Sequence, residues 1–337
     1  MKKFYSLLSA TFVLILGISL SSCAEPVDKN GAPDVPKFWP LTHVLSDDVV
    51  NRPAVSVKIE NDPEARPQTG LQDADIVWET MIEGGVTRFI AVYNSKIPEN
   101  VGPVRSLRIA DGPIAGPMKG LIVYSGSNGQ RFQQIARDAG SQTIEEDAGN
   151  KGFFREGLNA PHNDYYTLKD ALDQADKSHK EAPESQFEFT QEGQPSTPQA
   201  LGKDAKEMVD TMSQMFVTGW DYDAKAKAYK RTQEGAPFID KLTNKQVTAE
   251  NVIALKMDTS GTPEIDPAGN PEMQMHAVGS GTGKVMSGGK VLDIKWEKKD
   301  DKSLLKLFTL EGKEVQLTPG NVWVVLVPND GGDIQVK

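Results

Sequence analysis

Apolar and polar residues alternate over several short stretches of the chain, and this alternation predicts β-strands. In the stretch 55–60, Val, Val and Ile occupy every second position, with Ser, Lys and Glu between them. The turn sequence Asn61-Asp62-Pro63 follows directly, so this strand is expected to open into a loop after Glu60. Similar patterns predict strands at 76–79, 86–93, 121–124 and 187–189, and in the second half at 222–231, 252–257, 283–287, 291–296, 304–310, 314–317 and 322–327.

Helices are expected mainly in the first half. The stretch 106–121 has helical spacing but is interrupted by Pro113 and Pro117, which predicts a broken helix. The strand at 121–124 leads through a Ser, Gly and Asn loop into a predicted helix at 130–138, which is an α/β crossover. The start of that helix is either a plain N-cap or an anion site, because it offers free N–H groups. A last helix is expected at 167–175.

These elements predict an α+β protein with an N-terminal mixed α/β domain, built on a central sheet, and a smaller β-rich C-terminal domain. The expected boundaries are 40–178 for the first domain and 206–330 for the second. Proline and charged residues mark 179–205 as a linker region, and cutting it is expected to give two separately folded pieces.

The N-terminus has the pattern of a lipoprotein signal peptide. Lys2 and Lys3 precede an apolar stretch, and Leu20-Ser21-Ser22-Cys23 has the form of a bacterial lipobox. Residues 1–22 are therefore expected to be removed, and Cys23, the one cysteine in the sequence, to carry the lipid. The alternatives are an ordinary cleaved signal and a single membrane helix. Residues 23–39 have the composition of a flexible tether, and the body is expected on the extracytoplasmic face of the cell membrane.

Composition narrows the classes of partner. With 38% hydrophobic and 25% charged residues the chain is an ordinary globular protein, and its net charge of −10 argues against nucleic acid as a partner. The histidines lack metal-ligand spacing and a lone cysteine cannot form a cysteine-based zinc site, so neither a metal nor a cofactor is expected.

Ionisable residues gather where the predicted strands end, which indicates one polar cleft at a sheet edge. The predicted ligand-binding residues are Glu60, Asn61, Arg66, Asp75, Glu79, Glu83, Arg88, Arg105, Ser106, Arg108, His162 and Asn163. A guanidinium offers a planar fork of donors that suits carboxylate or phosphate. If the acidic residues satisfy only some of the arginines, the others are expected to form an anion site.

This region contains four distinctive segments: IENDPEARPQTGL from Ile59, ADIVWE from Ala74, EGGVTRF from Glu83 and GPVRSLR from Gly102. In this order and spacing they resemble the YerB-like lipoproteins of Gram-positive bacteria. That family has a domain of unknown function followed by a smaller C-terminal domain. The resemblance covers about residues 40–328 and implies an envelope location and two domains, but no reaction.

Three functions fit the sequence. The first is a non-enzymatic lipoprotein that binds a cell-wall component or a wall enzyme through the Arg/Glu-rich cleft. The second is a glycan hydrolase in which two of Glu60, Glu79 and Glu83 act as the acid and as the nucleophile or base, with His162 as another candidate base. Against it, these glutamates could pair with arginines in structural networks, and His162 could simply order its loop. The third is a solute-binding lipoprotein, which would need two α/β lobes.

Overall fold

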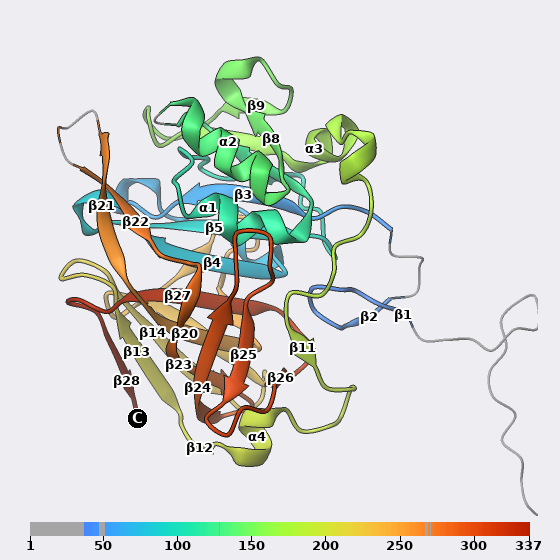
Figure 1. Cartoon of the computed structure of the whole chain (residues 1–337), viewed down its shortest axis with the longest axis vertical. Helices are drawn as coiled ribbons and strands as arrows, with labels where there is room; N and C mark the ends of the chain where they lie inside the picture. Colours follow the sequence, from blue (N-terminus) through green and yellow to red (C-terminus); the bar gives the residue numbers. More distant parts are fainter. Residues whose placement is uncertain (1–36, 47–50, 128, 267–268, 270) are drawn as a thin grey trace, which may run out of the picture. The chain divides into compact units, whose positions relative to one another are not determined.

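Both halves of the chain contribute strands to one large sheet (Figure 1). The computed structural model describes residues 37–46, 51–127, 129–266, 269 and 271–337, all within one compact unit. The predicted signal peptide, Cys23 and nearly all of the predicted tether lie outside the described residues.

The main sheet contains eleven of the strands in the described part of the chain. In spatial order ten of them are β12 (Lys203–Asp204), β24 (Lys290–Lys298), β23 (Gly279–Ser287), β20 (Asn251–Met257), β27 (Val322–Pro328), β4 (Ile76–Met81), β5 (Thr87–Tyr93), β3 (Val55–Glu60), β7 (Leu121–Tyr124) and β8 (Gln142–Glu145), and β25 (Lys306–Thr309) pairs with β24. The two halves join where β27 runs parallel to β4, with Val322 opposite Ile76. The sequence predicts a central sheet that belongs to the N-terminal domain. In the structure, strands of both halves form this sheet.

The predicted α/β crossover lies at the edge of the sheet that strands of the N-terminal half form. Strands β3, β7 and β8 are parallel, and helix α2 (Gln130–Ala139) connects β7 to β8. The strand predicted at 86–93 lies between β4 and β3, so its central position is confirmed. The stretch 106–121 contains two short helices, α1 (Asp111–Ala115) and the 3-10 helix η4 (Gly116–Met118), so the expected break in the helix is confirmed.

The two faces of the main sheet are covered differently. Helices α1 and α2 cover one face, which we call the helix face, where Ile114 and Phe132 pack with Ile90. The opposite face packs against a second sheet and helix α3 (Leu168–Gln174), with Trp220 and Trp323 in the shared core, and we call it the second-sheet face.

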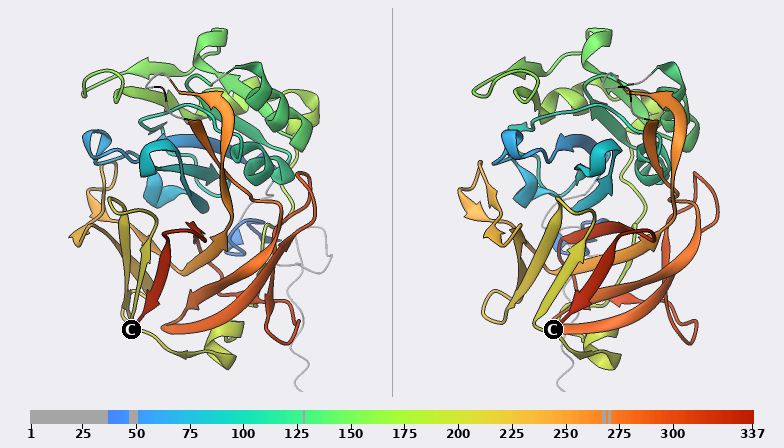
Figure 2. Two further views of the ribbon diagram at one scale, coloured as in Figure 1. Left: turned by 60° about the vertical axis from the view of Figure 1, so that its left-hand side comes forward. Right: turned by 90° about the vertical axis from the view of Figure 1, so that its left-hand side faces the viewer.

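The second sheet is formed by the C-terminal half, in the described residues, from six strands (Figure 2). They are β16 (Ala236–Pro237), β15 (Ala228–Gln233), β14 (Val217–Asp223), β13 (Glu207–Thr211), β28 (Asp333–Val336) and β19 (Thr248–Ala249). Sequence analysis predicted one strand at 222–231, but the structure has a hairpin there, because β14 and β15 pair antiparallel with Asp223 opposite Ala228. The turn includes Lys227 at a φ of 55°.

The remaining strands form small ladders. They are β1 (Lys37–Phe38) with β2 (Leu45–Ser46), β6 (Asn100–Val101) with β10 (Asp164–Thr167) and β9 (Phe153–Arg155), β11 (Glu188–Phe189) with β26 (Gln316–Leu317), β17 (Ile239–Asp240) with β18 (Lys245–Gln246), and β21 (Thr259–Ile265) with β22 (Pro271–Met275). The other 3-10 helices are η1 (Pro63–Ala65), η2 (Leu71–Asp73), η3 (Glu83–Gly85), η5 (Glu146–Ala148) and η6 (Lys177–His179). None of the helices in the described residues has the length and apolar character needed to cross a bilayer.

The region predicted as a linker pairs with two strands of the C-terminal half. It contains β11, the helix α4 (Thr197–Leu201) and β12, and it pairs with β26 through β11 and with β24 through β12. A capping box fixes the start of α4, where the Ser196 side chain accepts from the Gln199 N–H. The region is therefore part of the folded body.

Candidate functional site

Strand alternation separates the predicted site residues onto the two faces of the main sheet. Successive side chains of a strand point to opposite faces. On β3, Lys58 reaches Asp111 of helix α1 at 2.6 Å, so Lys58 and Glu60 lie on the helix face. The next side chain, Asn61, donates to Thr87 at 2.7 Å on the second-sheet face. The expectation of one cleft is therefore wrong, because the predicted residues fall into separate groups.

The first group, which we call the sheet-edge cluster, lies at the carboxyl ends of the parallel strands. It consists of Glu60, Glu83, Arg88, Arg105, Ser106, Arg108 and His162. The segment that carries three of these residues runs beside the loop after β7, because Ser125 N–H donates to the Arg105 carbonyl at 3.1 Å and Leu107 N–H donates to the Gly126 carbonyl at 3.0 Å. The carboxyl ends of parallel strands are the usual place for ligand sites in α/β sheets.

The three arginines of the sheet-edge cluster are not equally paired. Arg108 donates to Glu83 through Nε at 3.0 Å and also through Nη2. Burial lowers the pKa of Arg108, but the hydrogen bond and charge of Glu83, together with the charge of Glu272, raise it above its ordinary value. Arg105 forms an ion pair with Glu60, with 3.0 Å between Nε and Oε1.

Arg88 has no such carboxylate. Its Nη1 donates to the Ser106 carbonyl at 3.0 Å, and among the described residues no ion pair within 4.0 Å includes it. Burial, with the positive charges of Arg108 and Arg105, lowers the pKa of Arg88 to about 9. At neutral pH this guanidinium is still charged, and an added anion would stabilise it.

His162 lies between two carboxylates. Its Nδ1 is 3.1 Å from Glu60 Oε2, and its Nε2 is 3.3 Å from Glu64 Oε2. The side chain is 16% exposed, and both of its ring nitrogens lie within 3.3 Å of a carboxylate oxygen. Asn163 accepts instead from Arg155 at 3.1 Å, through Oδ1.

Sequence analysis missed an acidic pair beside this cluster. Glu146, just after β8, accepts from Ser125 Oγ at 2.5 Å and from Arg155 at 2.7 Å. Asp164 on β10 is buried, and burial together with the charge of Glu146 raises the pKa of Asp164 to about 6. The position of Glu146 at the end of a strand parallel to β3 and β7 was the signal that could have identified it.

A second group lies on the second-sheet face and is enclosed. Glu79 and Arg231 are completely buried, and Arg231 Nη2 lies 3.1 and 3.0 Å from the two carboxylate oxygens. The Trp323 indole N–H also donates to Glu79 at 3.2 Å, and the Arg231 guanidinium lies 3.9 Å from the centre of the Phe238 ring. This group joins strands from both halves of the chain.

Asp75 and Arg66 lie away from the sheet-edge cluster. Asp75, at the other end of β4, accepts from the backbone N–H groups of Asn94 and Ser95 at 2.5 and 2.7 Å, and burial raises its pKa. Arg66 donates to Glu234 at 2.7 Å and to the Asn61 carbonyl at 3.0 Å. Both side chains thus hold loops in place.

This geometry bears directly on the hydrolase hypothesis. A carboxylate pair for glycan hydrolysis needs two groups facing one another across the substrate, roughly 5 to 10 Å apart. Glu79 is on the opposite face of the sheet from Glu60, and Glu79 and Glu83 are each bound by an arginine through two contacts. These contacts favour the ion-network interpretation of the three glutamates. The two-lobed solute-binding architecture is also missing from the described residues, because both halves share one sheet.

Two family models match the chain. Residues 41–181 match the N-terminal domain of a protein family of unknown function, DUF3048, and residues 209–324 match its C-terminal domain. The chain is 29% identical to the protein named "Putative lipoprotein YerB" from Bacillus subtilis (strain 168), over 98% of this chain and 96% of that protein. The crystal structure of the YerB protein from Bacillus subtilis is similar with a TM-score of 0.74 and 27% identity, and the match covers 89% of this chain and 99% of that one. With both domains present in the expected order, the resemblance is confirmed, and the chain belongs to the YerB-like family of DUF3048 proteins.

Proposed function

We propose that this protein is a membrane-anchored lipoprotein of the cell envelope that binds an anionic group of a cell-wall component at the sheet-edge cluster, without catalysis. The lipid on Cys23 would hold the body on the extracytoplasmic face. The name of the Bacillus subtilis relative and the lipobox pattern support the anchor.

The binding proposal rests on one observation: among the described residues, no carboxylate forms an ion pair with Arg88. A buried guanidinium is costly unless charge or hydrogen bonds compensate for its lost hydration. Arg88 is 6% exposed and donates to one carbonyl, while Glu60 and Glu83 are already paired with Arg105 and Arg108. A carboxylate or phosphate group placed beside Arg88 would supply the missing negative charge.

Arg105 is the arginine through which a ligand would first make contact. Its side chain is 23% exposed, and it lies on the segment that follows Gly102-Pro103 beside the loop after β7. A bound anion would compete with Glu60 for this guanidinium, and His162 would still hold Glu60 in place at 3.1 Å. The cluster can therefore exchange one ion pair for another without exposing an unpaired carboxylate.

The test is a binding measurement on the full mature chain in detergent. Soluble peptidoglycan fragments serve as the probe, because they carry carboxylates, and wild type is compared with Arg105→Gln. Arg137→Gln is the matched control, since Arg137 is exposed on helix α2 and contacts Thr143 and Gln134. The proposal expects at least tenfold weaker binding for Arg105→Gln alone, on the order of one charge-assisted hydrogen bond. Equal binding by all three proteins would overturn it.

A further inference from the structure

A polar pocket with a tryptophan lies at the edge of the main sheet opposite to the sheet-edge cluster. Strands β3 and β4 are parallel, because both pair antiparallel with β5, and Asp75 comes just before β4 whereas Glu60 ends β3. The pocket has a volume of about 330 Å³, which is within the usual size of small-ligand sites. The lining residues that determine its chemistry are Trp39, Thr42, Asp73, Asp75, Lys96 and Glu250.

Trp39 supplies the pocket with an aromatic ring that is held in place from behind. The Arg52 guanidinium lies 4.6 Å from the centre of this ring. Arg52 also donates to the carbonyls of Asn94 and Ser95, which follow β5, at 2.5 and 2.6 Å. The indole is therefore fixed against the end of the sheet.

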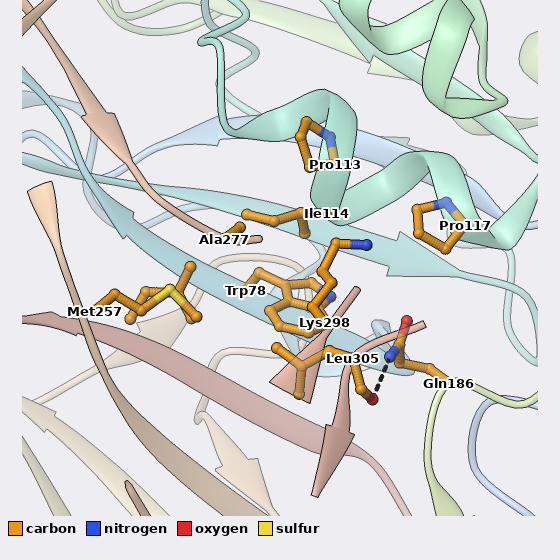
Figure 3. Close-up of a pocket in the computed structure, with 10 residues that line it drawn as sticks. Trp78, Pro113, Ile114, Pro117, Gln186, Met257, Ala277, Lys298 and Leu305 are labelled. Atoms are coloured by element: carbon orange, nitrogen blue, oxygen red, sulfur yellow. Dashed lines mark hydrogen bonds between the residues drawn. The ribbon is translucent and has the colours of Figure 1, made fainter. Parts of the chain in front are cut away.

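The cavity beside Trp78 has a different character. It has a volume of about 10 Å³ and is lined mainly by apolar side chains such as Ile114 and Leu305 (Figure 3). Such a cavity has room for about one water molecule. The far larger pocket beside Trp39 has room for a ligand.

Thr42 gives independent evidence for a ligand in this pocket. Its side chain is 4% exposed and lines the pocket, and among the described residues its Oγ1 has no hydrogen-bond partner. Its backbone is held, because its N–H donates to the Trp39 carbonyl at 3.3 Å and its carbonyl accepts from the Gly320 N–H at 2.8 Å. Burying a hydroxyl without a partner is unfavourable, so a ligand that bonds with it would be stabilised.

The carboxylates of the pocket have partners but can accept further hydrogen bonds. Asp73 pairs with Lys96 at 3.1 Å, and Asp75 accepts from two backbone N–H groups at 2.5 and 2.7 Å. Glu250 accepts from the Asn321 N–H at 2.9 Å, and burial raises the pKa of Glu250. Each carboxylate has more lone pairs than these bonds use, so hydroxyl groups of a ligand can still donate to them.

The charges around the pocket favour an uncharged ligand. Three carboxylates and one ammonium group line it, and this excess of negative charge disfavours an anion. A cation would meet the like charge of Lys96, and Arg52 already covers one face of the Trp39 ring. The C–H groups of a sugar ring can pack on an aromatic face, which has partial negative charge, without such repulsion.

We propose that this pocket binds a ring of an uncharged saccharide, with its C–H groups against Trp39. The hydroxyls of the sugar would bond with Thr42 Oγ1 and with the carboxylates, and Lys96 would donate to one of them. Val44 lines both this pocket and a groove of about 710 Å³ that contains Tyr222, so a chain of several sugars has room to continue. The proposal is independent of anion binding at the sheet-edge cluster.

The test uses the full mature chain labelled with 5-fluorotryptophan, in a detergent without a sugar headgroup, and follows the fluorine NMR signal of Trp39. The probe is the soluble tetramer of N-acetylglucosamine, which is uncharged. Trp39→Phe identifies the signal among those of the five tryptophans. Thr42→Val removes the hydroxyl and keeps the volume of the side chain. Ser141→Ala is the matched control, because it removes another buried hydroxyl that has no partner in the described residues and lies outside the pocket.

We expect the probe to shift the Trp39 signal equally in wild type and in Ser141→Ala, with little effect of salt. Binding to Thr42→Val should be about fivefold weaker or more, as for the loss of one neutral hydrogen bond. Its thermal unfolding should occur at or above the wild-type temperature, because Thr42 Oγ1 has no partner to lose in the described residues. Lys96→Gln, at a side chain that is 64% exposed, should keep the fold and also weaken binding.

Three results would contradict the proposal: an unshifted Trp39 signal at millimolar probe, equal weakening in Thr42→Val and Ser141→Ala, and unchanged affinity in both Thr42→Val and Lys96→Gln. A shift caused by ethanolamine but not by the saccharide would assign the pocket to a cation instead. Arg105→Gln should bind the probe as wild type does. If it lost binding, the saccharide would be bound at the sheet-edge cluster and not in this pocket.

Discussion

Glu79 and Arg231 are 152 residues apart in the chain, yet they form an ion pair at 3.0 Å with both side chains completely buried. Glu79 is in the region that matches the N-terminal family domain, and Arg231 is in the region that matches the C-terminal one. The pair is surrounded by Phe238, Trp323 and other aromatic rings. It therefore fixes how the two halves of the chain pack on one another.

Replacing Glu79 by Gln is expected to destabilise the whole protein. The buried Arg231 guanidinium would lose the carboxylate that it contacts, and breaking a buried pair in this way costs about 3 to 5 kcal/mol. Urea unfolding followed by tryptophan fluorescence measures the loss. Glu234→Gln is the control, because Glu234 is 41% exposed and its partner Arg66 also donates to the Asn61 carbonyl. A loss below about 1 kcal/mol for Glu79→Gln would contradict the expectation.

The two halves are expected to unfold together rather than as separate domains. A fragment of residues 37–181 would lose the β27 neighbour of β4 and leave that edge and the Glu79 carboxylate open. It should show no cooperative thermal transition by itself, while the longer chain shows one. Two resolved transitions in the longer chain, each reproduced by an isolated half, would restore the independent domains expected from the sequence.

Local patterns in the sequence predict individual strands better than they predict which strands pair with one another. The alternation at 55–60 correctly placed Lys58 and Glu60 on one side, because side-chain direction depends only on the strand itself. Whether Glu79 lies on the same face of the sheet as Glu60 depends on the pairing of β4 with β5 and β27. No local pattern contains this information. The partner Arg231 was missed for the same reason. Both arms of the hairpin carry strand-forming residues, so the pattern over 222–231 predicts a single strand.

The acidic pair predicts a pH dependence of stability. Burial and Glu146 raise the pKa of Asp164 to about 6, whereas an unfolded chain has a value near 3.9. Between these values the folded state holds more protons than the unfolded state, so stability falls as pH rises from about 4 to about 6. Asp164→Asn should remove this dependence and stabilise the protein at pH 7 by about 1 to 3 kcal/mol. The measurement is a comparison of denaturation curves of wild type and Asp164→Asn at pH 4.5 and pH 7. If Asp164 had an ordinary pKa, the variant would gain no stability relative to wild type between these two pH values.

Replacing Cys23 by Ala is expected to abolish lipid attachment, because we propose that the thiol at the end of the Leu20-Ser21-Ser22-Cys23 pattern accepts the lipid. The protein should then move to the medium or remain in the membrane as an uncleaved precursor. Cell fractionation with labelling by a fatty-acid analogue measures both outcomes. Mature acylated protein in the variant would disprove the assignment.

The arginines of the sheet-edge cluster should separate into functional and structural residues. Arg108→Gln leaves Glu83, which is 9% exposed, without its two-contact partner, so we expect a loss of about 2 to 4 kcal/mol. Arg105→Gln should cost less than about 1 kcal/mol, because its side chain is partly exposed and Glu60 keeps His162. Arg88→Gln loses the bond to the Ser106 carbonyl but also removes a cation that Arg105 and Arg108 repel.

The two effects at Arg88 oppose one another, so its replacement should change stability by no more than about 1 kcal/mol in either direction. Arg105→Gln and Arg88→Gln are therefore expected to lose anion binding while remaining folded, with Arg105 the stronger effect because it is the more exposed. Thermal unfolding of all three variants beside the binding measurement decides between the two roles. If Arg105→Gln and Arg88→Gln lost as much stability as Arg108→Gln, and binding fell only in proportion to unfolding, the whole cluster would be structural and the anion would have to bind elsewhere.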